Sequence, residues 1–122
     1  MREHIVLIVE DNPLNLELAT DLLELAGFRV ESSPNAHHGY ELAKKLHPDV
    51  ILMDISLPDV DGLTATKWIK DDAVLREVPV VALTAQAMHG DEARARAAGC
   101  DGYLTKPINI ATFVSSVSQF IA

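Results

Sequence analysis

Polar side chains stand directly after several apolar runs of this sequence. Glu10 and Asp11 follow one run, Asp54 follows another, Thr84 closes a third, and Lys106 lies just beyond the last. If the three carboxylates shared one crevice, they would repel one another and raise each other's pKa values unless a cation neutralised them. Mg²⁺ is the natural candidate, because it prefers hard oxygen ligands and keeps several of its waters.

These polar residues need a scaffold that brings them together, and the apolar runs predict one. Segments 5–9, 50–53 and 80–83 are uninterrupted and rich in β-branched residues, which is typical of strands buried on both faces of a parallel sheet. Segment 28–32 alternates apolar with polar residues and segment 103–104 is short, which is typical of edge strands. We therefore expect five strands.

Helical patterns separate these strands. The expected helices run from Asn12-Pro13 to Gly27, over 35–46, over 62–70, over 90–98 and through a closing amphipathic segment. Strands and helices thus alternate, and right-handed crossovers then favour a flavodoxin-like α/β fold with a five-stranded parallel sheet in the order 2-1-3-4-5 and helices on both faces. Ligands bind such sheets beyond the carboxyl ends of strands 1 and 3.

Two of these helices have apolar stripes that predict their buried faces. The stripe of the first helix consists of Leu18, Leu22, Leu25 and Ala26. The stripe of the closing helix consists of Ile110, Phe113, Val114, Val117 and Ile121.

Length and charge narrow the function classes. With 122 residues and 13.3 kDa, the chain fits one domain, residues 1–122,. Its net charge of −8 disfavours nucleic acid and anionic membranes as partners,. The only cysteine, Cys100, cannot form an internal disulfide, and no signal peptide or bilayer-spanning run is evident,. We therefore expect a cytoplasmic protein with no membrane partner.

Five short motifs resemble a known family, and together they cover nearly the whole chain. They are Val9-Glu10-Asp11-Asn12, Leu52-Met53-Asp54, Leu57-Pro58-Asp59 to Asp61-Gly62, Leu83-Thr84-Ala85 and Lys106-Pro107. In this order and spacing they are similar to the receiver domain of two-component response regulators, the CheY-like fold. Further segments, such as Thr66-Lys67-Trp68 and Ala87-Met88-His89-Gly90, most resemble the single-domain, DivK-like regulators.

The resemblance implies a phosphoryl switch. Asp54 would be the phosphoacceptor, and Mg²⁺ would be bound by Asp11, Asp54 and the backbone carbonyl of Ser56, with Glu10 in support. An aspartate carboxylate is expected to be ionised at neutral pH and to need no general base. Transfer from a phosphohistidine would then depend on alignment and on charge stabilisation by Mg²⁺ and Lys106, so that the chain catalyses only its own phosphorylation and dephosphorylation.

The resemblance also assigns parts of the switch. Thr84 would contact the phosphoryl group, Lys106 would pair with its oxygens, and the Lys106–Pro107 peptide bond would be cis. Tyr103 would change rotamer and alter the face formed by the fourth helix, fifth strand and fifth helix. The implied partners are a histidine kinase or a histidine phosphotransfer protein, and a downstream protein target. Ser56 and Gln86 occupy variable positions beside the phosphoryl group, so the sequence leaves its lifetime open.

Three alternatives remain open at this point. A haloacid-dehalogenase-type, Mg²⁺-dependent phosphohydrolase also uses an aspartate nucleophile, but here Asp54 is followed by Ile55-Ser56 without the expected second acid. A flavodoxin-type FMN binder needs a phosphate-binding first loop, and Glu10-Asp11 would repel phosphate. The chain could also be a receiver domain excised from a hybrid histidine kinase, although Met1 close to the first strand favours a free-standing regulator.

Overall fold

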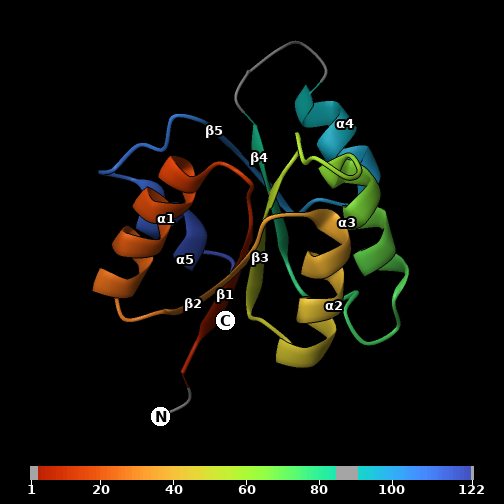
Figure 1. Ribbon diagram of the computed structural model, residues 1–122, viewed down its shortest axis with the longest axis horizontal. Helices are drawn as coiled ribbons and strands as arrows, with labels where there is room; N and C mark the ends of the chain where they lie inside the picture. The colour runs from red at the N-terminus through yellow and green to blue at the C-terminus, as the bar shows by residue number, and fades with distance from the viewer. Residues whose placement is uncertain (1–2, 85–90, 122) are drawn as a thin grey trace.

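A five-stranded parallel sheet forms the centre of the computed structural model, which describes residues 3–84 and 91–121 (Figure 1). The strand order is β2-β1-β3-β4-β5, which confirms the predicted topology. The strands are β1 (Ile5–Val9), β2 (Arg29–Ser33), β3 (Val50–Asp54), β4 (Val80–Thr84) and β5 (Gly102–Thr105).

Helices cover both faces of the sheet. They are α1 (Pro13–Leu25), α2 (Ala36–Leu46), α3 (Gly62–Asp71), α4 (Asp91–Ala98) and α5 (Phe113–Ser118). Figure 1 shows α1 and α5 on one face and α2, α3 and α4 on the other. Every helix therefore follows a strand and returns the chain to the amino-terminal side of the sheet, which leaves the carboxyl edge to the connecting loops.

The central strands supply an apolar layer to each face, because successive residues of a strand point to opposite sides. In β1, Val6 and Ile8 pack in the layer under α1 and α5, whereas Leu7 and Val9 pack in the layer under α2, α3 and α4. All four side chains are fully buried, and burial of each stabilises the fold by about 1.5–3 kcal/mol. The apolar runs thus hold the strand ends in place.

Short polar signals set the helix ends. Asn12 caps α1, since its side-chain oxygen accepts hydrogen bonds from the N–H groups of Leu14 (3.0 Å) and Asn15 (3.2 Å),. Pro13 occupies the first helical position, where no N–H is required. Gly27 then follows the helix with a φ of +97°, a left-handed conformation that favours glycine.

The two predicted apolar stripes are only partly correct. In α1 the buried residues are Ala19 and Leu23, so the buried face is rotated by one residue from the prediction and Leu25 is left 87% exposed. The closing helix is shorter than its stripe, because Ile110 is exposed and lies before α5 begins at Phe113. Leu25 and Ile110 are thus left outside the core, whereas Ile121 at the other end of the second stripe packs against it.

Other boundaries agree to within two residues with the prediction, where they can be compared. Gly90, where the fourth helix was expected to start, and Gln86 lie outside the described residues. Among residues 3–84 and 91–121, no helix is long and apolar enough to span a bilayer.

Candidate functional site

Four strand ends bring polar side chains to the carboxyl edge of the sheet. Asp54 ends β3 and Thr84 ends β4, while Glu10 directly follows β1 and Lys106 directly follows β5. The pairing of neighbouring strands aligns these ends. Asp54 lies opposite Leu83, and the Lys106 N–H donates to the Thr84 carbonyl at 2.6 Å. The edge therefore gathers the residues that the sequence singled out.

Lys106 lies between two buried carboxyl groups. Its ammonium Nζ donates to Glu10 Oε1 at 2.8 Å and lies 3.2 Å from Asp54 Oδ2. The three side chains are only 11%, 1% and 5% exposed, respectively. Burial opposes the charge of Lys106, but the Glu10 hydrogen bond and the negative charge nearby outweigh it and raise the lysine pKa. The crevice thus contains a fixed positive charge.

The pKa of Asp54 is strongly perturbed. Burial is the main cause, and the hydrogen bond with Glu10 and the negative charge of Glu10 add to it, so the pKa rises to about 7 although the Ser56 N–H and Lys106 favour the carboxylate. Without a cation, Asp54 is therefore only partly ionised at neutral pH. The expectation of an ionised aspartate took no account of burial and the second carboxyl, both of which raise its pKa when no cation is bound.

Glu10 is shifted in the opposite direction. Burial opposes its charge, but hydrogen bonds with Asp54, Lys106 and the Asn12 N–H outweigh burial and lower its pKa. The Asn12 N–H donates to Glu10 Oε2 at 3.2 Å. These contacts therefore favour the charged form of Glu10, whereas burial and the nearby Glu10 disfavour the charged form of Asp54.

Three carboxyl groups at this edge form a cluster that is exposed to solvent on the Asp11 side. Glu10, Asp11 and Asp54 each offer a carboxylate oxygen, and these oxygens lie within 4.8 Å of one another. Asp11 is exposed, whereas Glu10 and Asp54 are buried. A hard, oxygen-only donor set with one open side fits Mg²⁺, which retains waters. A cation bound there would favour the charged form of Asp54, which burial and the nearby Glu10 disfavour,.

The loop after β3 is folded tightly against Asp54. The Ser56 N–H donates to Asp54 Oδ1 at 3.0 Å, and the Gly62 N–H donates to the Ile55 carbonyl at 2.8 Å. At Gly62 any Cβ would overlap the Asp54 carbonyl oxygen, so only glycine allows α3 to start this close to the strand. The loop, residues 55–61, is thus closed at its base beside the phosphoacceptor candidate.

Thr84 and Tyr103 lie on neighbouring strands. Thr84 is buried, 6% exposed, at the end of β4. Tyr103 on β5 lies opposite Ala82 and is half-buried, packed against the apolar layer under α2, α3 and α4. The Lys106–Pro107 peptide bond is cis, the conformation that the resemblance implied.

Sequence reasoning missed two contacts. The first is the ion pair between Lys106 and Glu10, which spans the sheet because β3 and β4 separate β1 from β5. The second is made by Asp59, which had been noted only as part of a motif and which accepts hydrogen bonds from Ala36 and His37 of α2. The first contact could have been inferred, because the carboxyl ends of parallel strands lie at one edge of the sheet. No local signal in the sequence indicates the second contact.

Comparison with known proteins agrees with this geometry. The family described as "Response regulator receiver domain" matches residues 6–118. The polar-differentiation response regulator DivK of Brucella ovis is 47% identical over 116 residues, which cover 95% of this chain and 94% of that protein.

Solved structures extend the likeness to the fold. A putative response regulator from Chloroflexus aurantiacus superposes with a TM-score of 0.93 at 28% identity, over 98% of both chains. The receiver domain of the sensor histidine kinase PA1611 from Pseudomonas aeruginosa, with a magnesium ion coordinated in its active site cleft, superposes with a TM-score of 0.89 at 34% identity, also over 98% of both chains. The chain therefore belongs to the response regulator receiver domain family and has a CheY-like fold.

Proposed function

We propose that Asp54 is the phosphoacceptor of a Mg²⁺-dependent phosphorelay receiver. One observation carries the proposal: a buried carboxyl at the end of β3 lies 3.2 Å from a lysine ammonium and within an oxygen cluster open to solvent. The donor would be a phosphohistidine on a histidine kinase or a histidine phosphotransfer protein, which fits membership of the receiver family. The compartment that we expect is the cytoplasm.

The chemistry follows from the groups present. A carboxylate oxygen of Asp54 forms a bond to phosphorus as the bond from phosphorus to the histidine nitrogen breaks, and the product is an acyl phosphate. Lys106 is placed to donate hydrogen bonds to the phosphoryl oxygens, because its ammonium already faces Asp54 Oδ2,. Glu10 keeps Lys106 charged and oriented.

Mg²⁺ would be bound by Asp11, Asp54 and the Ser56 carbonyl, with Glu10 in support. Bound there, it would neutralise charge on the transferring phosphoryl group. The ion coordinated in the cleft of the PA1611 receiver domain supports this assignment at 34% identity. The mixed environment of exposed Asp11 and buried Asp54 suits an ion that keeps part of its hydration.

The test is phosphorylation by a small donor. With phosphoramidate and Mg²⁺, the intact mass should rise by one phosphoryl group, and peptide mapping should place a hydroxylamine-labile label on Asp54. The label should be absent without Mg²⁺ and absent in Asp54→Asn. A label on serine or histidine, or undiminished labelling of Asp54→Asn, would overturn the proposal.

The output would be a change of the surface formed by α4, β5 and α5. A phosphoryl group on Asp54 would draw the Thr84 hydroxyl toward it, and Tyr103 on the adjacent strand is the bulky group able to fill the vacated space. A protein partner that prefers this state must reciprocally favour phosphorylation.

NMR shifts with and without beryllofluoride test this route separately. The expected changes include Thr84 and Tyr103 and extend across α4. Shifts confined to the loops around Asp54 would refute the proposed output surface while leaving the phosphoacceptor assignment intact.

A further inference from the structure

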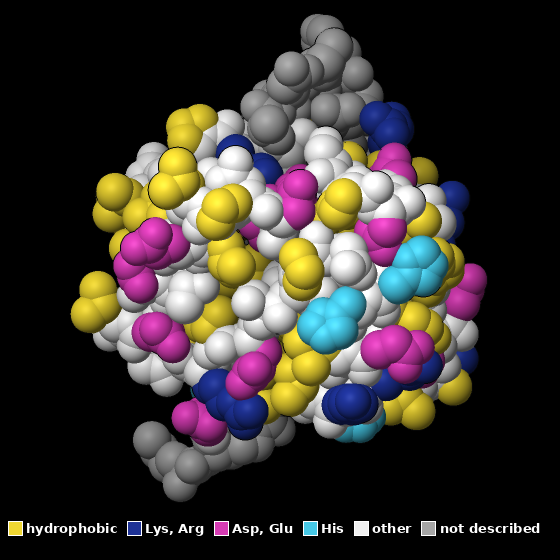
Figure 2. All heavy atoms as spheres, in the orientation of Figure 1, with side chains coloured by type: hydrophobic (Ala, Val, Ile, Leu, Met, Phe, Trp, Pro, Cys, Tyr) yellow, Lys and Arg dark blue, Asp and Glu magenta, His cyan; other side chains and the backbone are white. Residues whose placement is uncertain are grey.

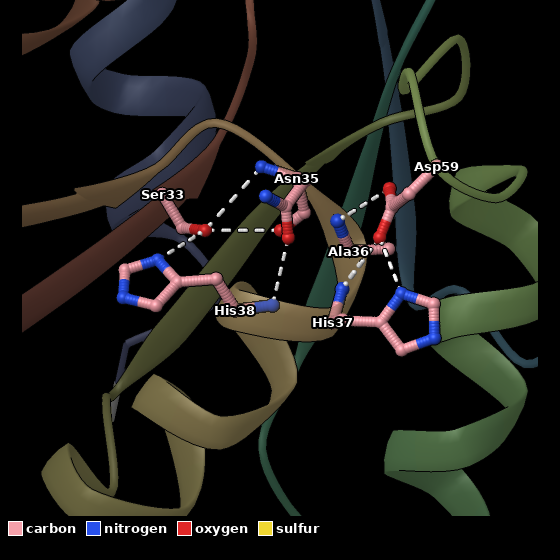
Figure 3. Close-up of polar contacts among 6 residues, drawn as sticks. All are labelled: Ser33, Asn35, Ala36, His37, His38 and Asp59. Atoms are coloured by element: carbon pink, nitrogen blue, oxygen red, sulfur yellow. Dashed lines mark hydrogen bonds and ion pairs between the residues drawn. The ribbon is translucent and has the colours of Figure 1, made fainter.

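Asp59 joins the loop after the phosphoacceptor candidate to a different element, α2. Its Oδ1 accepts a hydrogen bond from the Ala36 N–H at 2.9 Å, and its Oδ2 accepts one from the His37 N–H at 2.9 Å. The same Oδ2 lies 2.6 Å from Nδ1 of the His37 ring. Figure 3 shows Asp59 directed from its loop onto the first turn of α2. One carboxylate thus receives three donors from a helix 22 residues or more away in sequence.

The donors keep this carboxylate ionised. Burial opposes its charge, but hydrogen bonds from the Ala36 and His37 N–H groups, from the His37 ring and from the Val60 N–H hold the pKa of Asp59 far below its usual range. An ionised carboxylate can only accept hydrogen bonds, so Nδ1 of His37 carries a hydrogen and donates a hydrogen bond to Asp59. The negative charge also lies at the positive end of the α2 dipole.

The first turn of α2 is a rigid anchor. The Asn35 side chain accepts from the His38 N–H at 2.8 Å. Ser33 Oγ donates to the Asn35 carbonyl at 2.9 Å and therefore accepts from Nδ1 of His38 at 2.8 Å,. These contacts fix the helix start to the end of β2, as Figure 3 shows on the side opposite Asp59.

The anchored helix also packs tightly against the sheet. A Cβ at Gly39 would lie 2.8 Å from a methyl group of Val9, so the backbone of α2 approaches β1 closely. The ring of His37 lies 5.0 Å from that of Trp68 on α3, centroid to centroid. The His37 side chain is 67% exposed, so this ring contact lies at the surface. Figure 2 shows that histidine side chains are exposed on the face of the molecule drawn there. Asp59 is thus attached to a part of the structure with little freedom to move.

The loop itself is fixed at two points. Its base is closed by the hydrogen bonds of Ser56 to Asp54 and of Gly62 to Ile55. The second point is Asp59. Among the side-chain hydrogen bonds described for residues 55–60, only those of Asp59 reach α2. Ser56 belongs to the base and lies three residues before Asp59, so we expect both attachments to affect the direction of its backbone carbonyl.

We infer that Asp59 is a positioning residue for the proposed metal site: by tying the loop to the first turn of α2, it holds the Ser56 carbonyl where a divalent cation can bind it. The inference rests on the proposed Mg²⁺ site and assigns no direct contact between Asp59 and the ion. Groups that orient ligands affect metal affinity strongly, because misdirected ligands must be reordered on binding.

The experiment compares two caps of the same helix turn. Asp59→Asn removes the charge and places an amide against α2 donors, whereas Asn35→Ala removes the neighbouring cap without touching the loop. Titration of each folded protein with MgCl₂ by calorimetry should give an affinity about tenfold weaker for Asp59→Asn. Asn35→Ala should bind Mg²⁺ within twofold of wild type, although loss of a cap costs about 1 kcal/mol of stability.

A second variant, His37→Gln, and a second measurement, amide NMR shifts, distinguish a local effect on Mg²⁺ binding from a general loss of folding. His37→Gln removes only the ring donor and should weaken Mg²⁺ binding by about two- to threefold, at the low end of effects expected for groups behind a ligand. In wild type, Mg²⁺ should also shift the amide NMR signals of Ala36 and His37, and this response should be lost in Asp59→Asn.

The outcomes separate the inference from the function on which it rests. If wild type binds Mg²⁺ and Asp59→Asn binds it equally well, Asp59 is a structural cap only and the inference is wrong. It is also wrong if Asn35→Ala weakens binding as much as Asp59→Asn, because general loosening of α2 then explains both. If wild type itself binds no Mg²⁺, the proposed function fails instead. Should Asp59→Asn not fold, unchanged binding by His37→Gln overturns the inference.

Discussion

Two aspartates five positions apart, Asp54 and Asp59, have opposite surroundings. Asp54 is buried beside a second carboxyl, and its pKa is raised to about 7. Asp59 accepts hydrogen bonds from three donors of α2, and its pKa is held far below the usual range. Burial and a second carboxyl thus oppose the charge of the aspartate just before the loop, whereas three donors stabilise the charge of the aspartate within it.

Their opposite surroundings suit the two aspartates to different roles, Asp54 to reaction and metal binding and Asp59 to holding the backbone in place. A buried carboxylate whose charge is poorly compensated is stabilised by a bound cation, so its stability depends on Mg²⁺. A carboxylate whose charge is fully compensated gains nothing from a ligand and is suited to hold backbone in place. Substitution and pH should therefore affect the two residues in opposite ways.

The largest stability effect is expected from Lys106→Met. This substitution leaves Glu10 and Asp54 buried without the Lys106 ammonium. Removing one partner of a buried ion pair should lower the free energy of unfolding by about 3 kcal/mol at about pH 8. Lys44→Met is the matched control, because Lys44 pairs with Glu41 at the surface. Urea denaturation should show a clear loss for the first variant and little change for the second; equal small changes would mean that the crevice is well solvated.

Asp54→Asn should have the opposite sign and a somewhat smaller size. The pKa of Asp54 rises from 3.8 to about 7 on folding, so the folded state binds this proton more tightly and wild type loses stability as pH rises between these values. Without Mg²⁺ at about pH 8, the asparagine variant should be about 2 kcal/mol more stable than wild type.

The pH dependence and Mg²⁺ provide the controls for that prediction. The difference between Asp54→Asn and wild type should shrink as pH falls from about 7 and disappear below 3.8, where Asp54 is protonated in both states,. Saturating Mg²⁺ should stabilise wild type but much less the variant, because binding to the folded state alone raises its stability. A variant less stable than wild type under all conditions would show that Asp54 is a structural carboxylate.

The smallest effect is expected from Asp59→Ala. Loss of a helix cap should destabilise the protein by about 1 kcal/mol at neutral pH. The folded-state pKa of Asp59 is depressed, so its contribution is fully present above the ordinary value of 3.8 and is lost as pH falls below it,. Thermal melts of wild type and Asp59→Ala should therefore converge in acid, with exposed Glu17→Ala on α1 as a control that shows no such convergence.

Much of the fold could be predicted from the sequence because its signals are strong. Uninterrupted β-branched runs mark β1, β3 and β4, and the alternation with capped helices leaves few topologies. The same reasoning placed Glu10, Asp54 and Lys106 at one edge, since the carboxyl ends of parallel strands share it. The helix faces were less accurate, because the buried face of α1 depends on how far the sheet extends beneath it.

The electrostatics of the site could not be predicted in the same way. Whether Asp54 is ionised depends on its burial and on its separation from Glu10, and spacing in the sequence does not give either quantity. The contact of Asp59 with α2 joins residues more than 20 positions apart, and either partner alone resembles an ordinary loop or helix residue. Tertiary contacts of this kind become visible only once the loop is folded.

Carbon-13 NMR titration of the aspartate carboxyl groups tests the contrast most directly, because both residues are observed in one sample. Without Mg²⁺, Asp54 should titrate with a midpoint near 7, and Asp59 should stay ionised to the lowest pH at which the protein remains folded. Addition of MgCl₂ should lower the midpoint of Asp54 and leave that of Asp59 unchanged. Ordinary midpoints for both residues, or an Asp54 that Mg²⁺ does not affect, would contradict the assignment of Asp54 to chemistry and Asp59 to structure.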